Sequence, residues 1–318
     1  MTKYPKIESV EKIAVVGTGT IGSSWATYFL AQGYKVQAWD PGLEWQKKIG
    51  DFIDNAWPQM ETLGLHSAAK KSNITLCSTL KEAVSEADFV QESAPEQMEL
   101  KQQLFSQLHE FSRESAIISS STSGLIMSDM QNGILSADRF VVGHPFNPPH
   151  LIPLVEVVGG NATAPGAIDW TIEFYNHMGK HAIKIKKEVP GHLANRLQAA
   201  LWREAVLAVK NDLASVEDIN AAVARGPGLR WALMGPHMIM HLAGGKGGIS
   251  QMLHHFAPGI QEWWLDMAEN PILNDELQKT LIAGIEVESG DRSIETLEQQ
   301  RDEQLIKILK MLSKTEGH

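Results

Sequence analysis

The chain has 318 residues, a formal net charge of -10 at pH 7 and one cysteine, Cys77. The length suffices for two domains, and a single cysteine excludes an intrachain disulfide and a multi-cysteine metal site. An acidic pI near 5.6 without a lysine- or arginine-rich block argues against a nucleic-acid or anionic-membrane partner, so we expect a small-molecule substrate. No apolar run approaches the roughly 18 residues of a membrane span, and the first residues lack a signal-peptide core, which predicts a cytoplasmic location.

Strand-like and helix-like segments alternate through the first half of the chain. Segments with helical periodicity, such as residues 21–33 and 95–111, separate short runs rich in valine, isoleucine, alanine or aromatic residues. These runs occupy residues 12–17, 35–40, 88–94, 116–121 and 140–146. The alternation predicts an α/β fold, a Rossmann-like doubly wound parallel sheet with helices on both faces. We expect residues 154–160 and 181–187 to extend the same sheet.

The pattern changes after the VPG segment at residues 189–191. Residues 192–312 have an almost entirely helical pattern, which begins with a long helix and is interrupted by GPG, GP and GGKGG. We therefore predict a Rossmann-like domain over residues 1–190 and an all-helical domain over residues 191–318, with no flexible linker between them.

The segment VVGTGTIGSSW places Gly17, Gly19 and Gly22 directly after the first predicted strand, at the start of a helix that includes Thr20 and Ile21. In a GxGxxG turn the glycines permit a close approach of a pyrophosphate, which the first amides of the helix then bind. Asp40 ends the second predicted strand, where an acidic residue hydrogen-bonds the adenosine ribose. The alternative is a glycine-rich turn followed by a surface aspartate. Because Asp40 repels a 2′-phosphate, the motif predicts that this domain binds NAD rather than NADP.

A histidine and a glutamate lie in two apolar runs of the segment VVGHPFNPPHLIPLVEVVGG, residues 141–160. Histidine titrates near neutral pH, so His144 could accept a hydroxyl proton while a hydride leaves the same carbon. Glu156 could bond the far ring nitrogen and stabilise the imidazolium. The alternative is a histidine satisfied by a backbone carbonyl beside a glutamate at a strand edge.

Several motifs in order resemble the 3-hydroxyacyl-CoA dehydrogenase family: the glycine fingerprint, PEQMELK, SSSTSGL, GHPFNPP, LVEVV and PGHLANRL. The resemblance implies that His144 is the catalytic base and Glu156 its orienting partner. It also implies that Ser123 and Asn195 contact the reacting oxygen or the substrate, and that Glu96, Lys101 and Asn147 contact the cofactor. Three of these residues have simpler alternatives, since Ser123 could cap a following helix, Asn195 near a helix N-terminus could have a similar structural role, and Lys101 could be a solvated side chain.

The chain departs from the acyl-CoA members of the family over residues 42–72. Those members resemble one another in a strongly basic helical arm, whereas this segment has mixed charge. The chain is more similar to the branch that acts on free hydroxy acids, which includes the L-carnitine and L-gulonate 3-dehydrogenases. We therefore expect oxidation of a small 3-hydroxy acid, with carnitine as the first choice and L-gulonate or a 3-hydroxyacyl-CoA as alternatives. A redox-inactive, crystallin-like relative remains a further alternative.

A zwitterion such as carnitine needs a cation for its carboxylate and aromatic faces for its trimethylammonium group. Arg230 and Trp231, in the segment GPGLRWALMGP, and Trp202 are our candidates in the helical domain. Core or dimer packing is the alternative for each tryptophan. Histidines 237, 241, 254 and 255 could suggest a metal site, but hydride transfer to NAD needs none. The apolar helix faces and tryptophans of this domain predict a homodimer.

Overall fold

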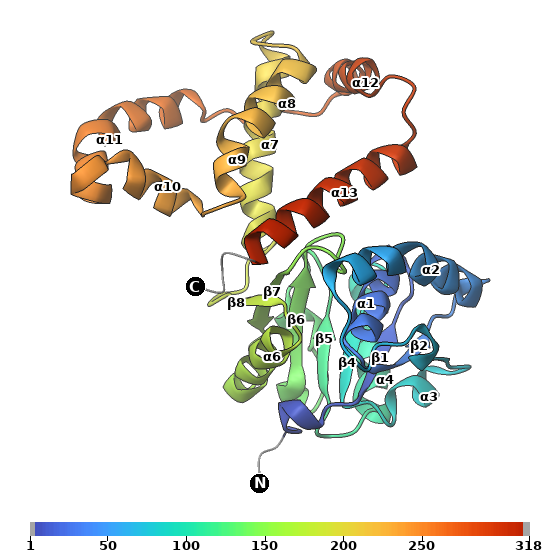
Figure 1. Cartoon of the computed structure of the whole chain (residues 1–318). Coiled ribbons are helices and arrows are strands. Elements are labelled where there is room, and N and C mark those ends of the chain that lie inside the picture. Colours follow the sequence, from blue (N-terminus) through green and yellow to red (C-terminus); the bar gives the residue numbers. More distant parts are fainter. Residues whose placement is uncertain (1–3, 314–318) are drawn as a thin grey trace. The chain divides into compact units, whose positions relative to one another are not determined.

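The computed structural model describes residues 4–313, which form two compact units (Figure 1). The first unit runs through Asn195 and includes Gln304–Lys310, and the second comprises Arg196–Glu303 and the last described residues. The division falls in the first turn of a helix. The residues just before it belong to the first unit, because the backbone amides of Leu193 and Ala194 donate hydrogen bonds to the side chain of Glu156 in the sheet.

An eight-stranded sheet forms the centre of the first unit within the described residues, in the order β3-β2-β1-β4-β5-β6-β7-β8. Its strands are β1 (Lys12–Val16), β2 (Lys35–Trp39), β3 (Ile74–Leu76), β4 (Phe89–Glu92), β5 (Ile117–Ser120), β6 (Phe140–Pro145), β7 (Leu154–Gly159) and β8 (His181–Lys184). The chain winds outward from β1 in both directions, toward β2 and toward β4. In doubly wound sheets, ligands bind at this reversal, beyond the carboxyl ends of the strands.

Two features of the sheet differ from the prediction. First, β7 runs antiparallel to β6, so the sheet is mostly rather than entirely parallel. Residues 146–153 connect these strands, and a parallel crossover needs about a dozen residues or more. Second, the sequence did not predict β3, a short edge strand whose Thr75 and Leu76 are exposed.

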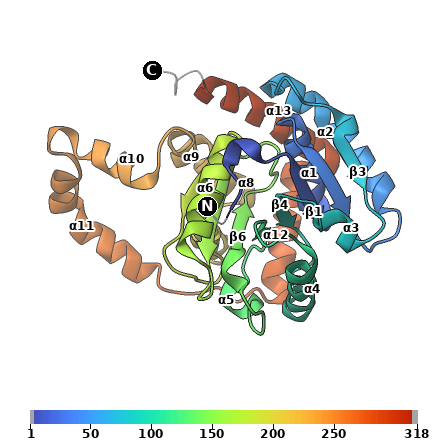
Figure 2. The same ribbon diagram turned by 90° about the horizontal axis from the view of Figure 1, so that it is seen from below.

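The helices of the first unit cover both faces of the sheet. They are α1 (Thr20–Ala31), α2 (Trp45–Leu63), α3 (Leu80–Val84), α4 (Met98–Phe111), α5 (Met127–Met130) and α6 (Pro165–His177). Side chains of α1, α2 and α6 share one apolar core with alternate strand residues such as Ile13 and Val15. Those of α3, α4 and α5 share a second core with Ala14 and Val16. Figure 2 shows these two layers, with α1 and α6 on one side of the strands and α4 and α5 on the other.

The other described helices follow these in the sequence, and the first of them begins within the first unit. They are α7 (Ala194–Lys210), α8 (Val216–Arg225), α9 (Pro227–Trp231), α10 (Pro236–Ala243), α11 (Gly248–Asp266), α12 (Asp275–Ser289) and α13 (Ile294–Ser313). Among residues 196–303 the buried apolar side chains are Val206, Leu207, Ile239, Met252 and Leu277. Many other large apolar side chains of this unit are exposed, including Trp202, Trp263 and Trp264. Within residues 4–313 no helix is long and apolar enough to cross a membrane.

Candidate active site

The glycine-rich turn between β1 and α1 brings two backbone segments into close contact. Gly17 has a φ of +88°, and a Cβ built there would lie 2.6 Å from the carbonyl oxygen of Ser93. A Cβ on Gly22 would lie 1.8 Å from the carbonyl oxygen of Gly17. A Cβ on Gly19, in contrast, would meet no atom of the chain within 4 Å. The turn is therefore closed on its inner side and open in front of Gly19, the N-cap residue of α1.

Asp40 follows β2 and lies beside this turn. Its Oδ2 accepts a hydrogen bond from the amide of Thr18 at 2.7 Å, and its Oδ1 accepts one from the amide of Gly42 at 2.7 Å. The carboxylate is thereby fixed next to the turn. The first amides of α1, Thr20 and Ile21 among them, lack intrahelical acceptors and can bind a pyrophosphate. The open space at Gly19, these amides and the fixed carboxylate fit an adenine dinucleotide with free ribose hydroxyls.

His144 on β6 and Glu156 on β7 lie directly opposite each other in the antiparallel pair. His144 Nδ1 is 2.8 Å from Glu156 Oε2, and both side chains are buried. Because an ionised carboxylate can only accept, Nδ1 carries the hydrogen, and Nε2 of a neutral His144 is left as the proton acceptor. The backbone amides of Leu193 and Ala194 each donate to Glu156 Oε1 at 2.9 Å. Burial acts to raise the pKa of Glu156, but His144 and these two amides outweigh it and lower the pKa.

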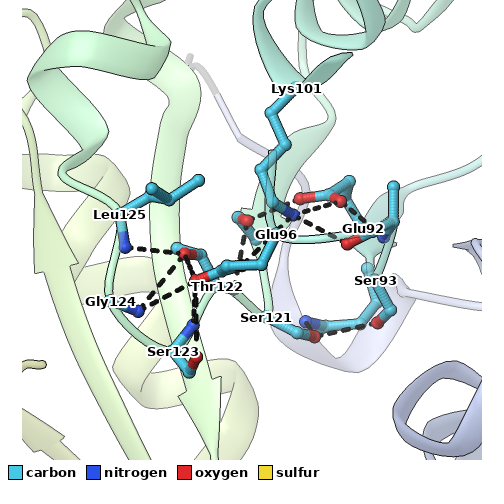
Figure 3. Close-up of polar contacts among 12 residues, drawn as sticks. Glu92, Ser93, Glu96, Lys101, Ser121, Thr122, Ser123, Gly124 and Leu125 are labelled. Atoms are coloured by element: carbon cyan, nitrogen blue, oxygen red, sulfur yellow. Dashed lines mark hydrogen bonds and ion pairs between the residues drawn. The ribbon is translucent and has the colours of Figure 1, made fainter. Parts of the chain in front are cut away.

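A second acidic group, Glu96, organises the segment that carries Ser123 (Figure 3). Glu96 Oε1 accepts hydrogen bonds from the hydroxyl of Thr122 at 2.6 Å and from the amides of Ser123 and Gly124 at 3.0 Å each. Burial acts to raise the pKa of Glu96, but the Thr122 hydroxyl, Lys101 and these amides lower it on balance.

The side chains of Ser123 and Asn195 also make hydrogen bonds in this segment. The Ser123 hydroxyl donates to Glu96 at 3.3 Å, and Asn195 Nδ2 donates to the carbonyl oxygen of Ser123 at 3.1 Å. The structure thus brings Ser123, Asn195 and Glu96 together. Ser123 does not cap a helix, since the N-cap residue of α5 is Ile126.

Lys101 is buried, which excludes the alternative of a solvated side chain. Its Nζ lies 2.7 Å from Glu92 Oε1, 3.1 Å from the carbonyl oxygen of Ala94 and 4.0 Å from Glu96 Oε2 (Figure 3). Glu92 was not among the residues predicted from the sequence. Its only signal there was an acidic residue inside the apolar run of residues 88–94.

His192 is another residue that the sequence patterns did not indicate. Its ring centroid lies 5.2 Å from that of His144, and its Nε2 is 3.1 Å from the carbonyl oxygen of Thr122. Only 2% of the residue is exposed, and its φ of +50° lies in the left-handed region that non-glycine residues rarely adopt. Burial lowers the pKa of His192, and the neighbouring His144 lowers it further.

The remaining predicted residues are not among the hydrogen-bond partners named above. Asn147 is exposed in the loop that follows β6. Trp202 on α7 and Arg230 and Trp231 on α9 belong to the second unit, and all three are exposed. Their side chains are free to contact a ligand or a second chain.

A family model of the 3-hydroxyacyl-CoA dehydrogenase NAD-binding domain matches residues 12–189, and the model of the C-terminal domain matches residues 191–281. The chain belongs to the 3-hydroxyacyl-CoA dehydrogenase family. Its cofactor is accordingly NAD, which agrees with the geometry at Gly19 and Asp40. Members of this family are NAD-dependent oxidoreductases, and this chain is one of them.

Relatives named L-carnitine dehydrogenase are similar along nearly the whole chain. The protein of Streptomyces griseus is 49% identical over 303 residues, which cover 95% of this chain and 90% of the relative. The protein of Bacillus cereus is 43% identical over 306 residues, covering 96% of this chain and 94% of the relative. The protein of Pseudomonas putida is 39% identical over 313 residues, covering 98% and 97%.

Two solved structures show the same architecture. An NAD-dependent dismutase, 5-formyl-3-hydroxy-2-methylpyridine 4-carboxylic acid 5-dehydrogenase, is 27% identical and has a TM-score of 0.83 over 97% of this chain and 99% of its own. The 3-hydroxybutyryl-CoA dehydrogenase of Escherichia coli is also 27% identical, with a TM-score of 0.64 over 78% of this chain and 53% of its own.

Proposed function

We propose that the protein oxidises L-carnitine to 3-dehydrocarnitine with NAD, and that His144 is the general base. The observation that carries the chemistry is the buried contact of 2.8 Å between His144 Nδ1 and Glu156 Oε2. The substrate is supported by relatives of 39–49% identity that are named L-carnitine dehydrogenase. Family membership alone would equally allow a 3-hydroxyacyl-CoA.

Residues of the first unit can accept the proton and position the reacting oxygen of the substrate. His144 Nε2 takes the proton of the substrate hydroxyl, and the Glu156 carboxylate stabilises the imidazolium that forms. Bound NAD supplies the acceptor for the hydride from the same carbon. Ser123 and Asn195, which are joined through the Ser123 carbonyl, hold the reacting oxygen near His144. The hydroxyl proton thus goes to His144, and the hydride, with its electron pair, would go to NAD.

The glycine turn, Asp40, Glu96 and Asn147 are our proposed cofactor contacts. Since the carboxylate of Asp40 is held by the amides of Thr18 and Gly42, it cannot turn away from a 2′-phosphate without losing two hydrogen bonds. A preference for NAD over NADP therefore follows from a fixed negative charge at this position.

The second unit is proposed to bind the two charged ends of carnitine and to form a homodimer. Arg230 would bind the carboxylate, and the ring faces of Trp231 or Trp202 would meet the trimethylammonium group. Trp263 and Trp264 of α11 are 67% and 66% exposed, a degree of apolar exposure that favours contact with a second copy. Light scattering should give about twice the chain mass of 35.1 kDa. A value equal to one chain at micromolar concentration would contradict the dimer.

One assay tests the proposed substrate. Formation of NADH is followed with L-carnitine, D-carnitine, L-gulonate and 3-hydroxybutyryl-CoA, each over a range of concentrations. We expect the highest kcat/KM with L-carnitine. A higher value with L-gulonate or with the CoA ester would make that compound the proposed substrate in place of carnitine, and no turnover of any hydroxy acid would favour a redox-inactive relative.

We also propose a cytoplasmic location, for which cell fractionation is the test.

A further inference from the structure

The loop of residues 146–153 joins β6 to β7 and contains Asn147, one of our proposed cofactor contacts. Three of its residues are prolines, Pro148, Pro149 and Pro153. A proline has no backbone N–H to donate, so contacts with other parts of the chain have a larger share in fixing this loop. Two buried side chains make such contacts, one from the loop itself and one from the segment before β8.

His150 of this loop is hydrogen-bonded to α1 through Ser24, and the two residues are 4% and 0% exposed. The Ser24 hydroxyl oxygen accepts from the backbone amide of His150 at 2.9 Å and lies 2.7 Å from Nδ1 of the same residue. Nε2 lies 2.7 Å from Oε1 of Gln59 in α2. Because an amide oxygen can only accept, Nε2 carries the ring hydrogen and Nδ1 accepts from the Ser24 hydroxyl. One imidazole therefore joins the loop to both helices.

Lys180 holds the same loop from the segment before β8. It is 6% exposed, and its Nζ donates to the carbonyl oxygens of Pro149 and, at 3.1 Å, of Ile152. The Nζ also lies 3.7 Å from the ring centroid of Tyr28 and 5.2 Å from that of Trp25, both on α1. The ammonium group thus contacts the loop and α1 at the same time.

Both sets of contacts use one face of α1. Ser24 and Tyr28 are four residues apart, so their side chains are neighbours on the helix surface. Ser24 comes one turn after Thr20, the first residue of α1, and His150 comes three residues after Asn147. A shift of the loop along α1 would therefore change the distance between Asn147 and the amides that can bind a pyrophosphate.

We propose that His150 and Lys180 are positioning residues that fix the loop on α1. Asn147 is thereby held at the distance from the glycine-rich turn that NAD has to span. The proposal rests on the proposed contact of Asn147 with the cofactor, and not on which hydroxy acid is oxidised.

Two substitutions of His150 separate its two side-chain hydrogen bonds. In His150→Asn the side-chain oxygen can take the place of Nδ1 and keep the bond to Ser24. In His150→Gln the amide nitrogen can take the place of Nε2 and keep the bond to Gln59. NAD affinity is measured by titration calorimetry of the full chain without substrate, and stability by urea unfolding. We expect His150→Gln to weaken NAD binding by about tenfold and His150→Asn by less than about threefold.

The comparison of these two variants distinguishes positioning from a purely structural role. If His150 only supports the fold, both variants will lose stability but bind NAD with wild-type affinity, and the proposal is wrong. It is also wrong if His150→Gln binds NAD as tightly as His150→Asn does.

Ser24→Ala tests the same hydrogen bond from the α1 side. Because Ser24 is 0% exposed, its hydroxyl cannot contact NAD itself, so any effect on affinity has to pass through the loop. We expect the variant to weaken NAD binding as His150→Gln does, and unchanged affinity would contradict the proposal. It also takes the place of His150→Gln if that variant fails to fold. Thr171→Val is the control, since it removes a buried hydroxyl that bonds to the Ala167 carbonyl within α6, and it should leave NAD affinity unchanged.

Lys180→Met keeps the length of the side chain but removes its hydrogen bonds to the loop. We expect NAD affinity to fall by about tenfold. Lys184→Met, at an exposed lysine of β8, is the matched control and should bind NAD like the wild type. Wild-type affinity in Lys180→Met would contradict the role of Lys180, and the His150 variants decide alone if Lys180→Met fails to fold.

A double-mutant cycle shows whether His150 acts through Asn147. Asn147→Ala alone should weaken NAD binding, and its addition to His150→Gln should weaken binding little further, because the contact is already lost. Fully additive effects would contradict this route. Unchanged affinity in Asn147→Ala would also overturn the proposal, because His150 would then have no cofactor contact to place. None of these measurements uses a hydroxy acid, so the carnitine proposal can fail while this one stands.

Discussion

His144 and Glu156 face each other across the one antiparallel strand pair described in the sheet, with Nδ1 and Oε2 2.8 Å apart. The direction of β7 is what makes this contact direct, since opposite residues of an antiparallel pair have neighbouring side chains on the same face. The amides of Leu193 and Ala194 hold the other oxygen of Glu156. The carboxylate therefore has a fixed orientation before any ligand binds.

The first prediction concerns the proton transfer by this pair. His144→Ala should lower kcat by about 10²–10⁴-fold, as is typical of a positioned general base, while NAD affinity stays within about threefold. Glu156→Gln should also lower kcat, because a neutral amide cannot stabilise the imidazolium. Steady-state kinetics with calorimetric NAD titration measures both. A near-normal kcat in His144→Ala would show that His144 is not the general base.

The second prediction is the pH dependence of the stability that Glu156 contributes. Its pKa in the folded chain is below the ordinary value of 4.5, so the ionised form favours folding. The contribution is fully present above the unfolded-state pKa and is lost as the pH falls toward the lower folded value. Urea unfolding of wild type and Glu156→Gln should therefore differ more at pH 7 than at pH 4. A difference that stays constant or grows toward acid would contradict this sign.

The third prediction uses two glycines of the same turn as a matched pair. A Cβ at Gly19 meets no atom of the chain within 4 Å, whereas one at Gly17 would lie 2.6 Å from the Ser93 carbonyl oxygen at a φ of +88°. Gly19→Ala should thus weaken NAD binding with little change in stability, because the methyl group enters the space for the pyrophosphate. Gly17→Ala should lower stability itself. Thermal unfolding and NAD titration of both variants give the comparison, and normal NAD affinity in Gly19→Ala would place the pyrophosphate elsewhere.

The sequence predicted most strands because each is a short apolar run bounded by turn residues, as at residues 12–17 and 35–40. It did not predict β3, since only three residues pair there and two of them are exposed. It also did not predict the direction of β7. Hydrophobic periodicity carries no direction, and the length of residues 146–153 was the only local information that did.

The candidate site also combines residues that the sequence pattern predicted and residues that it did not predict. Motifs near in sequence to a strand end, such as Gly17 to Gly22 and Asp40, could be placed from the pattern. The partners of Lys101 could not, because the sequence shows an acidic residue, Glu92, within the run of residues 88–94 but does not show which side chain pairs with it. The amides of Leu193 and Ala194 reach Glu156 across a long sequence separation, which only the folded chain reveals.

The fourth prediction concerns the imidazole beside the base. His192 Nε2 faces a carbonyl oxygen, which can only accept, so we expect the Nε2–H tautomer with a bare Nδ1. Burial and His144 together lower the pKa of His192, so it should stay neutral when His144 is protonated. Imidazole nitrogen NMR over a pH series should show both properties. In His144→Gln the pKa of His192 should rise, and no change would show that the two rings are uncoupled.

The last prediction concerns the two ends of the substrate. A trimethylammonium group cannot donate an N–H hydrogen bond, so ring faces and acidic side chains are its main partners, and a desolvated cation–π contact contributes up to about 2 kcal/mol. Losing one such contact corresponds to roughly 30-fold in binding. Trp231, which is 41% exposed, has room for this contact, and Arg230 beside it can bind the carboxylate. We expect Trp231→Leu to raise the KM for carnitine far more than that for NAD.

Arg230→Met should raise the KM for carnitine but not that for carnitinamide, because the neutral amide of carnitinamide does not need the guanidinium group. Arg225→Met, at an exposed arginine in the last turn of α8, is the matched control and should change neither KM. Kinetics with carnitine, carnitinamide and an uncharged analogue that lacks the ammonium group measures all three variants. If the uncharged analogue turns over as well as carnitine, the aromatic contact is wrong, because the site would then gain nothing from the cation. If Arg230→Met affects the acid and the amide equally, Arg230 acts through packing rather than through the carboxylate.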